Sequence, residues 1–457
     1  MKRVLLSLLA VFSMISAFAQ DVPAITLKAE VDGNSRELDV ALSVAGTVKI
    51  DWGDGNLVES EKISAFDGYT LTVISGVVKG DGAVKVYGDN IVYFDCSSRV
   101  DGAQVLSLDV TNAPALQELY ANTNKLASID LTKNVDLSKV DIQNNQLASI
   151  DLSKNVNLTK LTISKNLLSS IDISNNQKLN NLYIDNNKFE GALDFSSNPN
   201  LKSLYCFNND ITSVNLGDNV ADKPYFSFNN CKLTSFDASK LTKLSNGTLF
   251  LIGNQLTSIV LPADGVKTLN ISKNNFALAA LPQFTSTRYT YAPQAAYAVA
   301  EAYNVNDELD LSSQTDATLN TTFAVLNGDG EALIDGTDYT VTDGKIKFLT
   351  AQEAAYVTMT SAFFPKFTGS NIYKTTTFEV KGTGTGISDV EAENTHVSAN
   401  ANGLVISGLA KGDNVNVYAI NGMAVAQVKA AASVVNVPVA AGVYVVKVNG
   451  KTFKISK

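Results

Sequence analysis

The sequence is poor in the side chains on which most enzymes and metal sites depend. It has one histidine, three cysteines and one tryptophan in 457 residues. Outside His396, near the C-terminal end, the chain offers no Ser–His–Asp or Cys–His arrangement and none of the commonest zinc sites. It also contains no phosphate-binding glycine loop and no dinucleotide fingerprint. We therefore expect no catalytic residue, no cofactor and no metal, and a protein that is not an enzyme.

Positive charge is also in short supply. Lysine and arginine number 36 against 45 aspartate and glutamate residues, which gives a net charge of −9. This balance argues against nucleic acid and anionic membrane surfaces as partners. Carboxylates are abundant enough to leave a two-carboxylate glycosidase formally open, but the sequence singles out no such pair in a cleft.

The three cysteines are Cys96, Cys206 and Cys231. An odd and small count does not build a disulfide framework in an exported protein, and the spacings match no zinc pattern. Two interpretations are open, which are packing at buried positions and a redox or metal role. Packing is the favoured one, because free cysteine behaves as a small apolar side chain.

Long hydrophobic runs are missing except at the start of the chain. Lys2 and Arg3 precede the apolar run Val4–Phe12, and small residues lead up to Ala19. The run is too short to span a bilayer and has the pattern of a signal peptide. We expect residues 1–19 to be removed, no transmembrane segment, and a protein that is secreted or on the outer cell surface.

What the sequence has in abundance is an internal repeat. Leu116-Gln-Glu-Leu119-Tyr-Ala121-Asn-Thr-Asn124-Lys-Leu126 recurs along the chain, with its asparagine spaced 20 to 23 residues apart. The asparagine position is filled by Asn124, Asn145, Asn166, Asn187, Asn209, Cys231, Asn254 and Asn274. The pattern L-x-x-L-x-L-x-x-N/C-x-L resembles the leucine-rich-repeat family. The resemblance implies a solenoid over 106–284 built from units of about 21 residues.

Each unit predicts one short strand with a buried face, and stacked units predict a parallel sheet over a continuous core. The recurring asparagine would pair backbone groups that are otherwise buried and unsatisfied. A second alternating motif, as in Leu126-Ala-Ser-Ile129-Asp-Leu131, predicts another short strand on the back of each coil. Two interpretations are open for the aspartates of this motif, a cation-binding ridge and a solvated column bonded to neighbouring serines. The column comprises Asp130, Asp151, Asp172, Asp194 and Asp237, with Asn215 in the same register.

The outward residues of the front strands would form a concave face. Its middle units carry aromatic side chains, which either cover the sheet or form the centre of an interface. We favour binding, and the candidate ligand-binding residues are Tyr183, Asp185, Tyr205, Phe207, Tyr225, Asn229 and Phe250.

The regions on either side of the repeat predict β-sandwiches. Residues 20–105 contain Ile50-Asp-Trp-Gly-Asp-Gly55, which resembles the strand-turn of polycystic-kidney-disease-type sandwiches, with Trp52 in the core. This region would also cap the solenoid. Residues 285–381 resemble immunoglobulin-like modules in general pattern. Residues 382–388 form a glycine-rich linker.

Residues 389–457 contain two Asn-Gly turns between alternating strands, at Asn421-Gly422 and Asn449-Gly450. The segments Val415-Asn-Val-Tyr418 and Gly442-Val-Tyr-Val-Val-Lys-Val448 resemble the type A C-terminal sorting domain of the type IX secretion system. The resemblance implies export by that machinery and removal of this domain. The alternative is one more stalk sandwich.

Together these patterns predict a monomeric, exported recognition or adhesion protein that binds a protein or a glycan on its concave face. The alternative is a glycan-capture accessory for nutrient uptake that uses the same aromatic cluster.

Overall fold

The computed structural model describes residues 22–31, 37–43, 47–60, 71–98, 102–283, 286, 288–382 and 395–457. These residues are mainly β-structure with a few short 3-10 helices. None of the described helices is long and apolar enough to cross a membrane. The expected signal peptide and most of the expected linker lie outside the described residues. Two compact units are present, and residues 313–320 and 360–373 belong to the first unit together with the chain up to 297.

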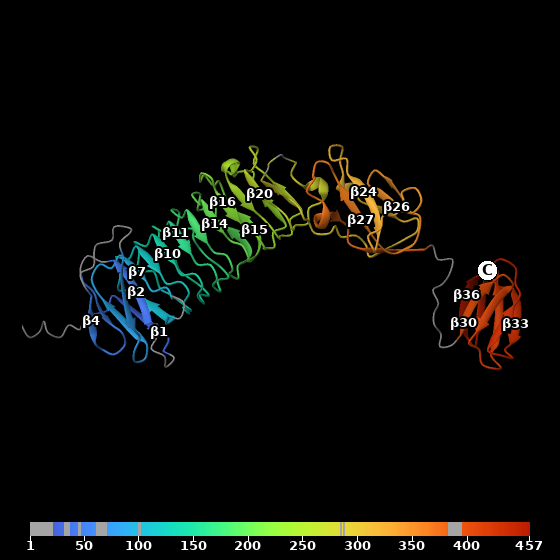
Figure 1. The fold of residues 1–457 in the computed structure, drawn as a ribbon, viewed down its shortest axis with the longest axis horizontal. Helices are drawn as coiled ribbons and strands as arrows, with labels where there is room; N and C mark the ends of the chain where they lie inside the picture. Colours follow the sequence, from blue (N-terminus) through green and yellow to red (C-terminus); the bar gives the residue numbers. More distant parts are fainter. Residues whose placement is uncertain are drawn as a thin grey trace, which may run out of the picture. The chain divides into compact units, whose positions relative to one another are not determined.

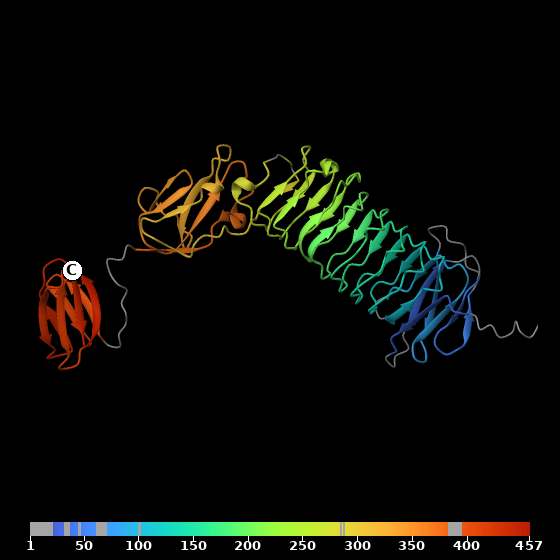
Figure 2. The same cartoon turned by 180° about the vertical axis from the view of Figure 1, so that it is seen from behind.

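The repeat folds as the expected β-solenoid, whose front is one continuous sheet (Figures 1 and 2). Its parallel strands pair in register, and the middle residue of each coil's strand is buried, as in Leu161 and Leu182. The ladder is one strand longer at each end than the 106–284 repeat. The parallel strands are β7 (Tyr93–Asp95), β9 (Glu118–Tyr120), β10 (Lys139–Asp141), β11 (Lys160–Thr162), β12 (Asn181–Tyr183), β14 (Ser203–Tyr205), β16 (Tyr225–Ser227), β18 (Thr248–Phe250), β20 (Thr268–Asn270) and β21 (Tyr289–Thr290).

The N-terminal region closes the first end of the solenoid, because it extends the front sheet and pairs with the back of the first coil. Strand β2 (Glu37–Ser43) pairs antiparallel with β7, and β5 (Thr72–Val77) pairs antiparallel with β2, so both extend the front sheet. On the back of the first coil, β8 (Val105–Asp109) pairs with β1 (Ile25–Ala29). The second sheet continues through β6 (Ala83–Tyr87), β3 (Lys49–Asp51) and β4 (Leu57–Glu59). Trp52 is 6% exposed in this region and lies against Gly76.

The asparagine ladder makes the expected bonds. Asn166 Oδ1 accepts from the Leu147 N–H (3.0 Å), and its Nδ2 donates to the carbonyls of Ile142 (3.0 Å) and Ile163 (3.1 Å). One amide therefore joins two coils. Gln294, which the repeat pattern missed, takes the same role after Asn274 and donates to the Ile271 carbonyl (2.9 Å).

The expectation of a back strand in every coil is wrong for the early coils. In the described chain, residues 126–131, 147–152 and 168–173 form no strand. A second asparagine ladder satisfies carbonyls there instead, since Asn155 Nδ2 donates to Leu131 (3.0 Å) and Asn134 (2.9 Å). Apart from β8 on the first coil, the back strands of the described chain lie in later coils, as β13 (Glu190–Asp194), β15 (Asp210–Asn215), β17 (Ser235–Asp237) and β19 (Ser258–Val260).

The far end of the solenoid is covered by segments that follow it by up to 100 residues in sequence. The Tyr373 hydroxyl donates to the Phe276 carbonyl (2.8 Å), and Gln314 Oε1 accepts from the Leu278 N–H (2.8 Å). The Tyr291 ring lies 5.1 Å from that of Phe364, centroid to centroid. These contacts bury the last coil, whose apolar edge would otherwise face water.

Residues 302–381 form two more sheets. One has the order β22-β29-β27-β24, with β28 on β27, and the other has the order β23-β26-β25. The strands are β22 (Ala302–Asn304), β23 (Glu308–Asp310), β24 (Thr322–Asn327), β25 (Tyr339–Thr342), β26 (Lys345–Phe348), β27 (Gln352–Thr360), β28 (Tyr373–Lys374) and β29 (Phe378–Lys381).

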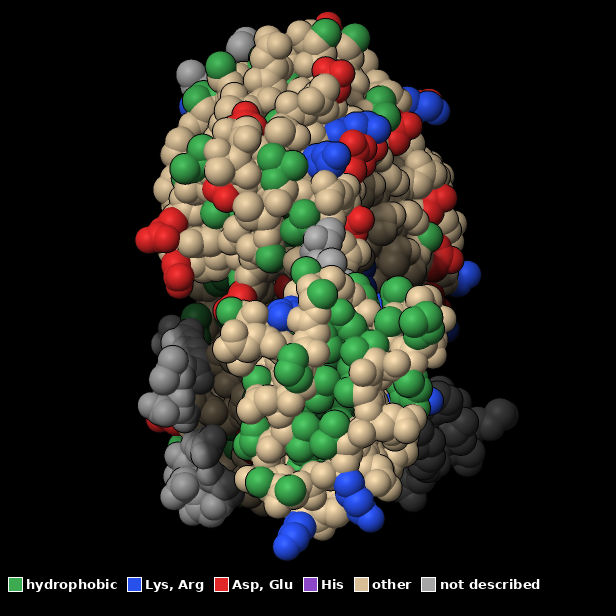
Figure 3. Space-filling model, turned by 90° about the vertical axis from the view of Figure 1, so that its right-hand side faces the viewer, with side chains coloured by type: hydrophobic (Ala, Val, Ile, Leu, Met, Phe, Trp, Pro, Cys, Tyr) green, Lys and Arg blue, Asp and Glu red, His purple; other side chains and the backbone are tan. Residues whose placement is uncertain are grey.

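Residues 395–457 form two sheets around one apolar core. Both Asn-Gly hairpins form, and the turn at Asn449 and Gly450 has positive φ at both residues. Hydrophobic side chains gather on the surface of this region (Figure 3). Its exposed hydrophobic residues include Ile420 and Met423. The strands are β30 (His396–Asn400), β31 (Gly403–Ser407), β34 (Val434–Val437), and β33 (Ala424–Lys429), β32 (Asn414–Ala419), β35 (Val443–Val448), β36 (Lys451–Ser456).

Candidate functional site: the front face of the solenoid

The front face is the outward side of the parallel sheet, and the register sorts its side chains into two rows. The first row holds the first residue of each strand, and the second row holds the third residue. Because neighbouring strands are about 4.8 Å apart, residues of one row contact each other along the solenoid. The first row runs Tyr93, Glu118, Lys139, Lys160, Asn181, Ser203, Tyr225, Thr248, Thr268, and the second runs Asp95, Tyr120, Asp141, Thr162, Tyr183, Tyr205, Ser227, Phe250, Asn270.

Four rings from four successive strands form an aromatic stack. Tyr183 and Tyr205 stack with centroids 4.9 Å apart and planes inclined by 24°. Tyr225 stacks on the other side of Tyr205, at 5.0 Å and 18°, although it belongs to the first row. It can do so because the second-row residue of its own strand, Ser227, is small and buried. Phe250 meets Tyr225 edge-on at 5.5 Å and 79°.

The stacking determines what the rings can offer a ligand. Both faces of Tyr205 are covered by its neighbours, and Lys160 Nζ lies 5.8 Å from the centroid of Tyr183. The surface therefore presents ring edges and hydroxyls. Burial raises the pKa of Tyr183 and of Tyr205, so these hydroxyls are neutral donors near pH 7.

The remaining predicted site residues lie beside the stack. Phe207 meets Tyr205 edge-on at 6.4 Å. Asp185 is buried and accepts hydrogen bonds from Ser164 Oγ (2.6 Å) and Asn186 Nδ2 (2.7 Å). Asn229 Oδ1 accepts from the Ile252 N–H (2.9 Å), and its Nδ2 donates to Ser227 Oγ (3.2 Å). The structure thus brings five aromatic residues together, while Asp185 and Asn229 make bonds within the solenoid.

The first strands carry charged residues and a separate pair of tyrosines. Glu118 pairs with Lys139 Nζ (2.8 Å) and accepts from the Tyr120 hydroxyl (2.8 Å). The rings of Tyr93 and Tyr120 lie 5.2 Å apart. Sequence reasoning missed Tyr93, because it stands 25 residues before Glu118 rather than about 21. Burial raises the pKa of the half-buried Asp141 carboxyl.

The aspartate column on the back makes local hydrogen bonds. Asp151 Oδ1 accepts from the N–H of Ser153 (2.9 Å), and the other members bond to the residue two positions later in the same way. These bonds lower the pKa of the column's carboxyls. This pattern is the serine-bonded column that the sequence left as one of two alternatives. No cluster of three metal-ligating side chains occurs among the residues that the structure describes.

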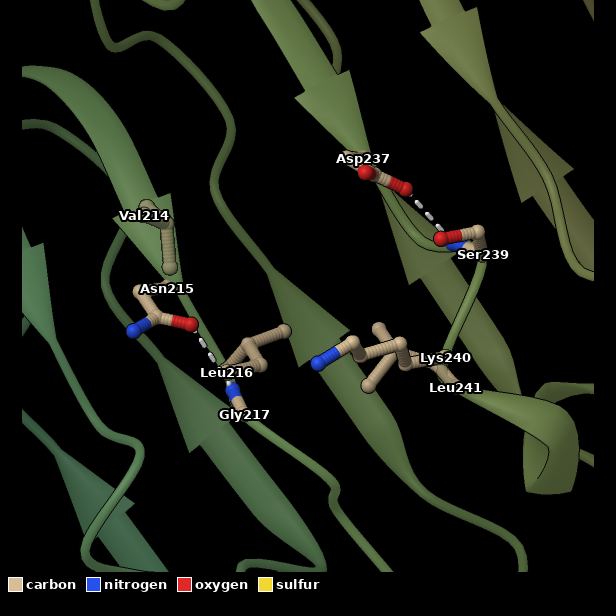
Figure 4. Close-up of a pocket in the computed structure, with 8 residues that line it drawn as sticks. All are labelled: Val214, Asn215, Leu216, Gly217, Asp237, Ser239, Lys240 and Leu241. Atoms are coloured by element: carbon tan, nitrogen blue, oxygen red, sulfur yellow. Dashed lines mark hydrogen bonds between the residues drawn. The ribbon is translucent and has the colours of Figure 1, made fainter.

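A hollow of about 180 Å³ opens on the back between β15 and β17 (Figure 4). Its polar side chains are already engaged in turns, since Asp237 Oδ1 accepts from the Ser239 N–H (2.8 Å) and Asn215 Oδ1 from the Gly217 N–H (3.0 Å). Lys240, on the same rim, pairs with Asp218 at 3.4 Å. The hollow therefore presents no convergent set of free polar groups.

The three cysteines are free and buried in the core. Cys231 occupies an asparagine position of the ladder, and its thiol donates to the Cys206 carbonyl (3.5 Å). Burial raises the pKa of Cys231 to about 11 and those of Cys96 and Cys206 further. Protonated, buried thiols fit the packing interpretation.

The sequence matches no known protein-family model and no curated protein. Solved structures similar to the chain include leucine-rich-repeat proteins. The functional domain of InlJ from Listeria monocytogenes, which includes a cysteine ladder, is 17% identical over 64% of this chain and 67% of that chain, with a TM-score of 0.42. InlP from the same organism is 15% identical over 60% and 77%, with a TM-score of 0.36. YopM, a leucine-rich effector protein from Yersinia pestis, is 18% identical over 43% and 58%, with a TM-score of 0.29.

Proposed function

We propose that this chain is a recognition protein that binds another protein through the front face of its solenoid. The observation that carries the proposal is the aromatic stack of Tyr183, Tyr205, Tyr225 and Phe250. Partly exposed aromatic side chains surrounded by polar residues are typical of interface centres. The stack is also preformed, so a partner that binds it need not order those side chains, which lowers the entropic cost of association.

The same geometry favours a protein over a glycan. A sugar that stacks on an aromatic residue uses an open ring face, whereas the faces of Tyr205 are both covered. The neutral hydroxyls and ring edges suit backbone carbonyls and aliphatic side chains. Glycan capture remains the second candidate function, and the edge-on rings of Phe207 and Phe250 are where it would have to occur.

The proposal includes export to the cell surface or the medium. It rests on the signal-peptide pattern of residues 1–19 and on the resemblance of residues 389–457 to a type IX sorting domain. In this proposal the secretion machinery recognises the C-terminal domain and removes it. The remaining chain then acts in adhesion through its solenoid. The flanking sheets would be immunoglobulin-like modules that hold the solenoid away from the surface.

The binding test uses the full chain on arrays of proteins and of glycans, with Tyr205→Ala and Phe250→Ala as variants. Tyr356→Ala is the matched control, because Tyr356 is a half-buried tyrosine on β27, outside the front face. We expect protein ligands that the control retains and both variants lose. Binding that both variants retain would refute the front-face proposal, and glycan-only binding would favour the second function.

The export test compares the intact mass and location of the protein in producing cells with and without residues 389–457. We expect a mature species without the C-terminal domain outside the cell, and an intracellular species when that domain is deleted. A full-length chain retained at the surface would contradict the sorting-domain proposal.

A further inference from the structure

Between the charged strands and the aromatic stack, the front face carries two neighbouring polar side chains of the second row, Asp141 and Thr162. We call this pair the niche, and its buried member is Thr162. This residue is in the second row, next to Asp141 on one side and Tyr183 on the other. Leu161 points into the core, so Thr162 points to the front face. Thr162 is 7% exposed, and its Oγ1 has no hydrogen-bond partner within the described chain. A buried hydroxyl without a partner is costly, and such groups are uncommon in native proteins.

Asp141 is the second residue of the niche. Its carboxylate is half-buried and accepts one long hydrogen bond, from the Gln143 N–H at 3.3 Å. None of the described cationic groups lies within 4.0 Å of it, because Lys139 pairs with Glu118 and Lys160 lies over the Tyr183 ring. Lys160 acts on the Asp141 carboxylate at longer range but makes no ion pair with it, so burial still raises the pKa of this carboxyl.

The row continues with further groups that attract a cation. Asp141 is in register with Tyr120, and Tyr120 is in register with Asp95. The Tyr120 ring thus stands between two carboxylates, and its hydroxyl is used in the bond to Glu118. Aromatic rings and carboxylates both attract positive groups.

We propose that this Asp141–Thr162 niche receives the guanidinium of an arginine side chain of the protein partner. A guanidinium has five donors in a planar fork, so one N–H can bond to the Asp141 carboxylate while another bonds to Thr162 Oγ1. That oxygen is covered in the free chain, so the side chains around it must shift to admit the guanidinium. Its flat face can also rest against Tyr120. A lysine ammonium is a compact, strongly hydrated charge and matches this arrangement less well. The inference rests on the proposed function and adds the chemistry of the partner: an arginine next to an apolar segment that covers the stack.

The niche can be tested without the partner. The probe is N-acetyl-arginine amide, titrated into the full chain and followed by NMR or calorimetry, with the lysine and citrulline amides for comparison. We expect a dissociation constant on the order of 1 mM for the arginine amide and binding at least about tenfold weaker for citrulline, which has the same shape without the charge. Equal binding of arginine and citrulline amides would overturn the proposal.

Two variants define the contacts. Asp141→Asn is expected to weaken the arginine amide at least about tenfold, and Thr162→Val about threefold. The Thr162→Val chain should melt no lower than the parent, because the hydroxyl has no internal partner to lose. Asp151→Asn, which removes one carboxylate from the back column, is the matched control and should leave binding unchanged. Arginine-amide binding unaffected by Asp141→Asn, or a lower melting temperature in Thr162→Val, would refute the assignment.

The two proposals fail in different ways. A chain that binds the arginine amide but no protein ligand would keep the niche and refute the proposed function. A chain whose protein ligand depends on Tyr205 but not on Asp141 would keep the proposed function and refute the niche.

Discussion

The asparagine ladder predicts a large penalty for a change that removes only a few atoms, Asn166→Ala. Asn166 is 5% exposed and makes four hydrogen bonds to backbone groups. The three carbonyls that lose its amide each keep another donor: the side chain of Asn145 for Ile142, that of Asn187 for Ile163, and the Asn144 N–H for Ser164. The Leu147 N–H, in contrast, loses its side-chain acceptor in a buried position.

The expected loss in the free energy of unfolding follows from this difference between the Leu147 N–H and the carbonyls. A buried donor without an acceptor costs about 1–3 kcal/mol, and each weakened carbonyl adds about 0.5 kcal/mol, so the loss is about 3 kcal/mol. The assay is the free energy of unfolding from urea titration followed by circular dichroism. Asn157→Ala is the control, because Asn157 is only half-buried and makes two surface bonds, one to the Val135 carbonyl (3.4 Å) and one from Lys178 Nζ (2.7 Å). Together these bonds should matter by less than about 1 kcal/mol. Equal destabilisation by the two changes would refute the view that the ladder holds adjacent coils together.

Four further changes have defined outcomes. Cys231→Asn restores a donor to the ladder and should raise the free energy of unfolding by about 1 kcal/mol, which the same urea titration measures. Gly76→Ala would place a Cβ 2.1 Å from Trp52 Cε2, so it should cost at least about 2 kcal/mol and shift the Trp52 fluorescence to longer wavelength. Burial raises the pKa of Cys231 to about 11, against about 8.5 for an unfolded thiol, so its contribution to stability is complete below about pH 8.5 and is lost as the pH rises towards 11. Urea titrations between pH 8 and 11 should therefore show a steeper decline for the parent chain than for Cys231→Asn. Tyr205→Ala removes the central ring of the aromatic stack and should weaken a front-face protein ligand about 30-fold, measured by calorimetry, whereas Tyr356→Ala should not.

The repeat could be predicted from the sequence because its stabilising bonds join each coil to its neighbour and recur with the same spacing. The pattern around Asn166 gave the strand, its buried face and the role of the asparagine, and the structure confirms all three. The pattern also gave a back strand in each coil, which fails in the early coils. There a second ladder of buried asparagines donates hydrogen bonds to the backbone carbonyls. The alternation of residues in Leu126–Leu131 is the same for a strand and for an extended segment bonded in this way, so it did not distinguish the two.

The candidate site was predictable in part. The spacing placed Tyr183 and Tyr205 on one row, because parallel strands in register align residues one repeat apart. It did not predict that Tyr225 crosses from the other row to stack on Tyr205, since that depends on the small size of Ser227 and on side-chain rotamers. The sequence also did not predict that the Thr162 hydroxyl lacks a hydrogen-bond partner, because a sequence shows which donors and acceptors are present but not which of them pair.

By itself, the sequence determined the solenoid: its period, its core and its asparagine ladder all follow from contacts between each coil and the next. Only the tertiary structure decided how the solenoid ends. The first coil continues into antiparallel strands at residues 37–43, and the last coil is covered by residues 313–320 and 360–373. No periodic signal marks such contacts, because each occurs once and joins segments far apart in the chain. They form because an apolar coil left open at either end would expose the core to water.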